Sequence, residues 1–399
     1  MTDCCIIGGG IIGLSIAREL AGRGFSVRVL SRDASRDTAS WAAAGIFPPA
    51  PESAAASAND RLTAYSDRLH RKWSEELRNE TGIDNELEAC GGLHLAADER
   101  GIPRLREAQC AWHAKGARCD WLTGPDLARQ EPALRAAVEQ GRILAGLLLP
   151  EEMRIRPPQH LEAVGRSCRM RGVEIMPAAD VQAIDVRDGR IEGIRIAAGE
   201  GRAATDIVRA DRYCLAAGAW SGDLAAALGL HVETRPIRGQ IALLRLPRQV
   251  LTRVVNVGLE YLVPRNDGRL LVGSTIEDAG FDKATTPQVI ERLIAFSHRL
   301  LGPLPGAVLE QSWAGLRPGS VDGCPFIGAA PACSNAFVAA GHFRAGLHQS
   351  TGTAVLLADL MTGRPPALDL TAFAPDRRPE ANSPDSVQAY LARAAEASD

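Results

Sequence analysis

The feature that most constrains the fold is a glycine-rich turn near the start of the chain, where Gly8, Gly10 and Gly13 form the pattern G-x-G-x-x-G. Apolar residues 4–7 before the turn predict a short buried strand, and residues 14–21 after it predict a helix. The first glycine makes the tight turn, the second lets the backbone approach a pyrophosphate, and the third lets the helix pack on the strand. Backbone N–H groups at the start of the helix then bind the phosphates. The sequence therefore predicts a dinucleotide-binding βαβ unit.

The second strand of this unit, predicted over residues 25–30, ends at Ser31 and Arg32. Such units usually have an acid near this point, which binds the adenosine ribose hydroxyls, whereas a nearby arginine accommodates the 2'-phosphate of NADP. Asp33 follows slightly later in the chain. On these residues alone, NADP is a competing cofactor.

Length and composition describe an ordinary globular protein. The 399 residues are enough for two domains, and the formal net charge of −3 offers no basic field for nucleic acid or an acidic membrane. The nine cysteines are scattered, and no metal-site spacing is present. No apolar run reaches the ~18 residues of a membrane span, and the chain enters its first strand without room for a signal peptide. We therefore expect a soluble cytoplasmic protein without a metal.

A second domain is indicated by the middle of the chain. Residues 239–246, 254–257, 261–264 and 269–274 alternate as strands, and no helix is predicted between them. Consecutive strands without helices form an antiparallel sheet, unlike the parallel sheet of the first unit. The polar residues beyond 365 are expected to be loosely ordered, apart from a short helix near 388–395.

Several motifs occur in order along the chain: I-I-G-G-G-I-I-G at 6–13, A-A-A-G at 42–45, A-G-A-W-S at 217–221, Y-L-V-P-R at 261–265, L-L-V-G-S-T at 270–275, W-A-G-L-R-P-G-S-x-D-G-x-P-x-I-G at 313–328 and A-A-G-H-F-R-x-G at 339–346. Together they resemble the glycine oxidase branch of the D-amino-acid oxidase family of FAD flavoenzymes, which is linked to thiamine biosynthesis. The resemblance extends from residue 3 to about 362.

The resemblance implies an α/β fold in which a Rossmann-type FAD-binding domain is interleaved with an antiparallel-sheet substrate domain, as in glutathione reductase and D-amino-acid oxidase. We expect the FAD-binding domain at 1–86, 147–221 and 311–365, the substrate domain at 87–146 and 222–310, and a C-terminal tail at 366–399.

The resemblance also implies FAD, which has no 2'-phosphate, and this argues against NADP. Most relatives have an acid where this chain has Ser31, so Ser31 or Asp33 is expected to replace that contact and Arg32 to stack on adenine. Sarcosine oxidases attach flavin through a cysteine, whose place Gly315 takes, so non-covalent FAD is expected. The expected cofactor-binding residues are Gly8, Gly10, Ile11, Ile12, Gly13, Ser31, Arg32, Ser40, Ala43, Ala44, Gly45, Ile46, Val181, Ala217, Gly218, Trp220, His342, Phe343, Arg344, Ala345, Gly346 and Leu347.

Three residues match the family's catalytic positions. Arg317 is expected to bind the substrate carboxylate, since a guanidinium can pair both oxygens at once. The hydroxyl of Tyr261 would contact the same carboxylate, and Arg344 would raise the positive potential near the flavin. The alternatives are a surface charge for Arg317, a packing role for Tyr261 and a structural ion pair for Arg344. His342 is read as structural, because hydride transfer from a neutral amine needs no base.

The implied reaction is oxidative deamination of glycine, sarcosine or a small D-amino acid, with O2 reduced to H2O2, by a homo-oligomer that relatives suggest is a tetramer. Two departures weaken glycine as the substrate: residues 347–351 are more polar than in glycine oxidases, and Leu259 replaces a histidine. A dehydrogenase that passes electrons to a quinone or a partner protein is the alternative, followed by a non-catalytic flavin-binding scaffold.

Overall fold

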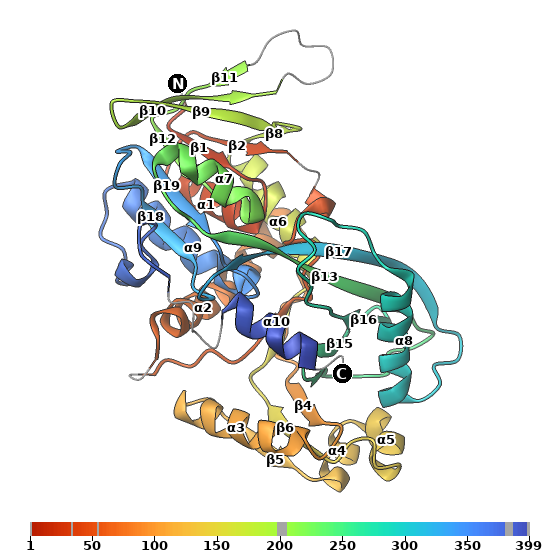
Figure 1. The fold of residues 1–399 in the computed structure, drawn as a ribbon. Coiled ribbons are helices and arrows are strands. Elements are labelled where there is room, and N and C mark those ends of the chain that lie inside the picture. The colour runs from red at the N-terminus through yellow and green to blue at the C-terminus, as the bar shows by residue number, and fades with distance from the viewer. Residues whose placement is uncertain (1, 33–34, 54–55, 198–205, 380–385, 397–399) are drawn as a thin grey trace.

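A computed structural model describes residues 2–32, 35–53, 56–197, 206–379 and 386–396 of the protein. Two large sheets dominate the fold. In Figure 1 the six-stranded sheet lies between a small three-stranded sheet and a group of helices, and the eight-stranded sheet forms the other half of the molecule. The mixed α/β architecture that the sequence predicted is confirmed.

The six-stranded sheet contains the dinucleotide-binding unit. Its order is β18-β19-β12-β1-β2-β8, and all neighbours are parallel except β18 and β19. Helix α1 (Ile11–Gly22) connects β1 to β2, which confirms the predicted βαβ unit. The strands are β1 (Cys4–Ile7), β2 (Val27–Ser31), β8 (Glu174–Pro177), β12 (Arg212–Leu215), β18 (Phe326–Ala329) and β19 (Ala336–Ala340).

Alternation along β1 divides the core around this sheet into two layers. Cys4 and Ile6 pack with the helices, whereas Cys5 and Ile7 pack with the three-stranded sheet on the opposite face. The helices are α1, α2 (Ala58–Thr81), α6 (Pro157–Met170) and α9 (Gly346–Met361), and the three strands are β9 (Val181–Arg187), β10 (Arg190–Ile196) and β11 (Asp206–Val208). Because both faces are covered, the strands can be apolar throughout.

The eight-stranded sheet has the order β17-β13-β16-β15-β14-β4-β6-β5, with only the β14–β4 pair parallel. Its strands are β4 (Gly92–Ala96), β5 (Asp120–Leu122), β6 (Ala145–Leu149), β13 (Thr234–Arg245), β14 (Val254–Val257), β15 (Glu260–Pro264), β16 (Arg269–Gly273) and β17 (Val308–Ser320). Helices α3 (Gly101–Ala114), α4 (Gly124–Gln130), α5 (Arg135–Glu139) and α8 (Pro287–Leu301) accompany it. The antiparallel run from β13 to β16 is the one that the alternation predicted.

Two of the expected domain boundaries fall inside strands of this sheet. The boundary at 146/147 cuts β6, and the one at 310/311 cuts β17. A strand that is hydrogen-bonded within a sheet belongs with that sheet, so we propose that the substrate domain continues to the ends of β6 and β17. Arg317 then stands on the substrate-domain sheet, on the long strand that faces the cofactor-binding domain.

Shorter elements join the two halves. Strands β3 (Ile46–Phe47) and β7 (Met153–Arg154) form a two-stranded ribbon, and helix α7 (Ser221–Ala225) follows β12. Single 3₁₀ turns occur at η1 (Ser35–Asp37), η2 (Pro132–Leu134), η3 (Gly218–Trp220), η4 (Ala226–Leu228) and η5 (Thr371–Phe373). No helix in the described ranges is long and apolar enough to cross a membrane.

The C-terminal tail is less loose than its composition predicts. Helix α10 (Val387–Glu396) agrees with the short helix expected near 388–395, but it is packed on the protein. Val387 is only 2% exposed and shares an apolar cluster with Ile237 and Phe343.

Buried histidines connect helices α2, α6 and α9. His70 Nε2 lies 3.1 Å from the carbonyl oxygen of Leu347 and 2.9 Å from that of His348, so it carries the proton and donates to them. The side-chain amide of Asn85 donates to His160 Nδ1 over 3.0 Å. Burial lowers the pKa of His70 well below 6.5 and lowers the pKa of His160 to about 4. Both imidazoles are therefore neutral in the folded protein at neutral pH.

Neutral buried histidines predict acid sensitivity. In the unfolded chain they take up protons near pH 6.5, but in the folded chain His160 does so only near pH 4. Their contribution to stability is complete above pH 6.5 and is lost as the pH falls towards 4. Urea unfolding at pH 5 and 7 should show a smaller pH effect for His160→Asn than for wild type, by roughly 2 kcal/mol. Asparagine can still accept from Asn85 but cannot titrate, so equal slopes for the two proteins would contradict this explanation.

Candidate active site

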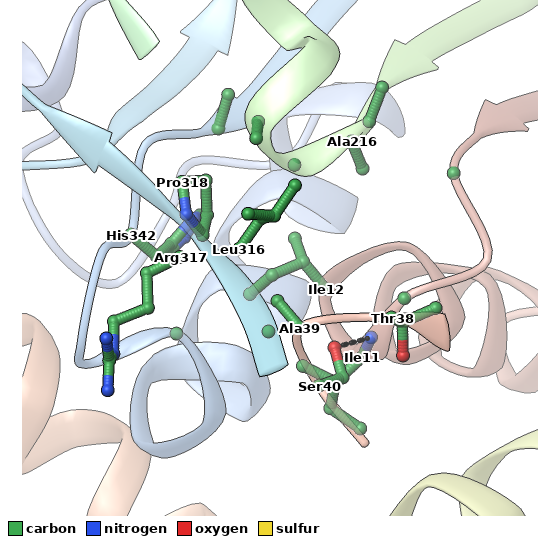
Figure 2. Close-up of a pocket in the computed structure, with 18 of the residues that line it drawn as sticks. Ile11, Ile12, Thr38, Ala39, Ser40, Ala216, Leu316, Arg317, Pro318 and His342 are labelled. Carbon is green, nitrogen blue, oxygen red and sulfur yellow. Dashed lines mark hydrogen bonds between the residues drawn. The ribbon is translucent and has the colours of Figure 1, made fainter. Parts of the chain in front are cut away.

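A cavity of about 450 Å³ lies where the carboxyl ends of the parallel strands meet the eight-stranded sheet. The ends of β1, β2, β12 and β19 all open into it, which is the usual ligand position in such sheets. Figure 2 shows Ser40 and Thr38 on one side of Leu316 and the guanidinium of Arg317 on the other. The cavity thus joins a glycine turn to a cationic side chain.

The glycine turn leaves no room for side chains. A Cβ on Gly8, whose φ is +122°, would stand 2.2 Å from the carbonyl oxygen of Ala216. A Cβ on Gly13 would stand 2.0 Å from the carbonyl oxygen of Gly8, so Gly13 lets α1 pack against the strand. Helix α1 has no acid in its first turn, and the Ile11 N–H donates to Ser40 Oγ over 2.9 Å. A helix start without an acid, which follows a cradle of glycines and whose N-cap Gly10 has no side chain, fits a pyrophosphate.

The end of β2 has no acid, but carboxylates from other segments reach the same region. A Cβ on Gly9 would stand 2.4 Å from Ser31 Oγ, so this serine packs directly against the glycine turn. The guanidinium of Arg32 lies 4.1 Å from the ring centre of Trp220. Asp180 and Asp223 also line the cavity. They follow β8 and β12 in the chain rather than β2, so the fingerprint rule does not find them. Asp33 lies outside the described residues.

A buried arginine fixes the small-residue segment at 42–45. Arg265 donates to the carbonyl oxygens of Ala44, over 2.7 Å, and Ile155, over 2.8 Å. Burial lowers its pKa to about 10. Gly315 permits a second contact, since a Cβ there would stand 2.6 Å from that of Ala42. The arginine of the Y-L-V-P-R motif thus supports the cavity wall.

Arg317 and Tyr261 meet at the substrate-domain end of the cavity. A Cβ on Gly239 would stand 2.2 Å from Arg317 Nη1, and a Cβ on Gly273 would stand 2.7 Å from the Tyr261 hydroxyl oxygen. The two glycines therefore form a low floor on β13 and β16, and the guanidinium and the phenol lie over it. Both side chains line the cavity, as the resemblance implied.

The guanidinium of Arg317 is bound by neutral groups. It donates to the carbonyl oxygen of Thr275 over 3.1 Å and to Ser274 Oγ over 2.7 Å. Burial lowers the pKa of Arg317, but a guanidinium stays charged at neutral pH. No carboxylate among the described residues forms an ion pair with it. A half-buried cation of this kind favours an anionic ligand.

The turn after β19 places His342 and Arg344 differently. His342 is 3% exposed and its Nε2 lies 3.1 Å from Thr353 Oγ1, while burial lowers its pKa to about 3. It is therefore neutral and held within the protein. Arg344 is exposed at the edge of the cavity, with its guanidinium 4.7 Å from the ring centre of Tyr390.

Most of the expected residues meet at this cavity. Of those predicted to bind the cofactor or substrate, only Gly13 and Ala345 are outside the described lining. Gly13 packs helix on strand, and Ala345 stands at the start of α9. The lining residues outside the predicted set and the quoted motifs include Leu30, Thr38, Ala39, Ala179, Asp180, Asp223, Leu224, Gly239 and Ile241.

Comparison with known proteins identifies the family. The sequence pattern of the FAD-dependent oxidoreductases called DAO matches residues 3–360. The chain belongs to this family. It is 34% identical to a glycine oxidase of Pseudomonas aeruginosa over 376 residues, which are 94% of this chain and 98% of the relative. It superposes on the crystal structure of glycine oxidase from Geobacillus kaustophilus with a TM-score of 0.86 and 29% identity, over 95% of this chain and 99% of the other.

Membership of this DAO family decides between the two cofactors considered for the sequence. The protein is an FAD-dependent oxidoreductase, and the glycine cradle, the start of α1 and the small-residue segments fit that cofactor. The feature that favoured NADP over FAD was the arginine after β2, and that arginine stacks on Trp220. Another relative is the bifunctional ThiO/ThiG protein of Synechocystis. The two sequences are 33% identical over 384 aligned residues, which cover 94% of this chain and 54% of that protein.

The cradle makes a prediction about cofactor binding. Gly8→Ala would place a methyl group against backbone, so we expect FAD affinity to fall by more than tenfold, or ~1.4 kcal/mol. The matched control is Gly165→Ala inside α6, where a Cβ would approach nothing closer than 3.9 Å. This control should retain FAD and be more stable by about 0.5–1 kcal/mol. The ratio of flavin to protein absorbance after purification measures the FAD content of both variants. Full FAD content in Gly8→Ala would contradict the role of the glycine turn in binding the cofactor.

Proposed function

We propose that this protein oxidises glycine or another small amino acid, such as sarcosine or a small D-amino acid, and passes the electrons to O2. The observation that carries the proposal is the Arg317 guanidinium, which faces the cavity beside Tyr261 and has no carboxylate partner among the described residues. The names of the relatives, glycine oxidases at 31–34% identity, support the same reaction class.

Arg317 and Tyr261 would orient the substrate through its carboxylate. A guanidinium pairs both carboxylate oxygens, which fixes direction as well as charge, and the phenol adds a further donor. The bond from Cα to hydrogen would then face the bound flavin. Bound FAD supplies the acceptor for the hydride. Overall, the amino acid, O2 and water give the 2-oxo acid, ammonia or an amine, and H2O2.

No side chain has to remove a proton from a neutral amine. His342 is the histidine that the sequence motifs offer as a candidate base. Its low pKa makes it a weak base, and its contact with Thr353 indicates a structural role. A neutral imidazole with a pKa of about 3 has little basicity to contribute at neutral pH. The proposed roles are therefore binding and orientation rather than acid–base chemistry.

The test is the visible spectrum of the purified protein under nitrogen, before and after glycine is added. Loss of the flavin band confirms amine oxidation, and recovery on admitting air indicates an oxidase. Recovery only with a quinone would instead indicate the dehydrogenase. If glycine, sarcosine and D-alanine all leave the band unchanged, the proposed substrate class is wrong.

Several finer properties are part of the proposal. We propose a part in thiamine biosynthesis, supported by the motif resemblance and by the likeness to the ThiO/ThiG protein. We also propose a cytoplasmic location, as expected from the sequence, and a homotetramer, as the resemblance suggests. Light scattering during size-exclusion chromatography would test the tetramer.

The flavin should be bound without a covalent link. Gly315 occupies the position of the flavin-linked cysteine of sarcosine oxidases, and no described residue that lines the cavity is a cysteine. Acid precipitation should therefore release all yellow colour into the supernatant. Flavin that stays with the pellet would contradict this prediction.

Replacement of Arg317 tests the carboxylate site. Arg317→Ala should raise the apparent KM for the amino acid at least tenfold, or ~1.4 kcal/mol, with little loss of bound FAD. Arg317→Lys should recover only part of the affinity, because an ammonium cannot pair two oxygens in a fixed plane. The control is Arg245→Ala on the same sheet, whose side chain is 62% exposed. An unchanged KM in Arg317→Ala would remove this residue from the site.

A further inference from the structure

The C-terminal helix α10 lies outside the family match, which ends at residue 360. It nevertheless packs against β13 and the turn that follows β19, two segments that also line the cavity. Figure 1 shows α10 close to β13. Val387 contacts the strand that carries Arg317, because a Cβ on Gly319 would stand only 2.4 Å from its Cγ2. The absence of a side chain at Gly319 thus makes room for α10 two residues after Arg317.

Tyr390 of this helix contacts the turn that carries Arg344. The rings of Tyr390 and Phe343 meet edge to face, with centres 5.3 Å apart and planes at 75°. Phe343 has a φ of +46°, an uncommon conformation for a large side chain, and it is 7% exposed. Phe343 forms an apolar cluster with Ile237 and Val387, and Tyr390 packs against this cluster. Helix α10 therefore holds this turn in place.

The next residue in the turn is the second cation of the site. The Arg344 guanidinium lies 4.7 Å from the centre of the Tyr390 ring, within the range of a cation–π contact. No carboxylate among the described residues pairs with Arg344. Its charge also acts on Arg317 and, after burial, contributes to lowering the pKa of that residue. Without the Tyr390 ring, repulsion from Arg317 would favour conformations in which the Arg344 guanidinium lies further from the cavity.

We propose that Tyr390 is a positioning residue, which holds the Arg344 guanidinium at the cavity edge so that α10 completes the site for the substrate carboxylate. The inference rests on the proposed function, since it takes the ligand to be a carboxylate. It predicts that affinity for a small carboxylate depends on the aromatic face at position 390, and not only on the packing of α10.

The experiment compares Tyr390→Leu, Tyr390→Phe and wild-type holoenzyme. Leucine keeps apolar contact with Phe343 and Val387 but has no π face, whereas phenylalanine keeps the π face. Acetate binding is measured through the change in flavin absorbance, together with KM and kcat for glycine. Tyr390→Leu should raise the Kd of acetate and the KM about threefold to tenfold, with kcat within about twofold of wild type. Tyr390→Phe should restore both values.

Two further variants show whether the effect passes through Arg344. In an Arg344→Met background, Tyr390→Leu should cause no further rise in the Kd of acetate. Gln388→Ala, on an exposed part of the same helix, should leave the Kd unchanged and controls for general disturbance of α10. FAD content and Tm are recorded for every variant.

The outcomes separate this inference from the proposed function. The positioning role is overturned if Tyr390→Leu has the wild-type Kd for acetate, or if Tyr390→Leu raises this Kd equally in the wild-type and Arg344→Met backgrounds. The proposed glycine oxidation is unaffected by either result. If wild type neither binds acetate nor is reduced by any amino acid tested, both proposals are wrong. A rise in Tyr390→Leu that needs Arg344 and is absent in Tyr390→Phe supports the role.

Discussion

The guanidinium of Arg317 is half-buried over a floor of glycine, and the rest of the proposed chemistry depends on this placement. Charge in a partly buried position is costly unless it is compensated, and the groups that bind this guanidinium directly, a carbonyl and two hydroxyls, are neutral at pH 7. An anionic ligand would complete the compensation that the proposed function requires. Gly239 and Gly273 set the depth at which such an anion can lie, because side chains there would displace Arg317 and Tyr261.

The same sheet is attached to the cofactor-binding half by an apolar cluster, in which Ala44 and Ile46 pack against Tyr261, and by polar contacts to backbone. Arg265 binds the carbonyl oxygens of Ala44 and Ile155, and Gly315 lets β17 approach Ala42. These contacts place β17 and the small-residue segment at 42–45 against one cavity. A change at Arg265 would therefore alter the site without touching substrate, through the position of the wall.

The opening βαβ unit was predictable because its turn, strand and helix are encoded within some twenty neighbouring residues. Arg317 and Tyr261 were found through motifs, and the structure places both at the cavity. The role of Arg265 was not predictable, since its two acceptors come from distant segments. Nor was the glycine floor, which depends on the register of β13 with β16. The packing of α10 was not predictable from a tail of polar composition, in which Val387 supplies the buried apolar contact with Ile237 and Phe343.

The most direct measurement is a crystal structure of the FAD-loaded protein with acetate bound. The proposed site predicts both carboxylate oxygens within hydrogen-bond distance of Arg317, with the Tyr261 hydroxyl donating to one of them. Acetate held elsewhere, with the guanidinium still bonded only to Ser274 and Thr275, would contradict the assignment of Arg317 as the carboxylate-binding residue.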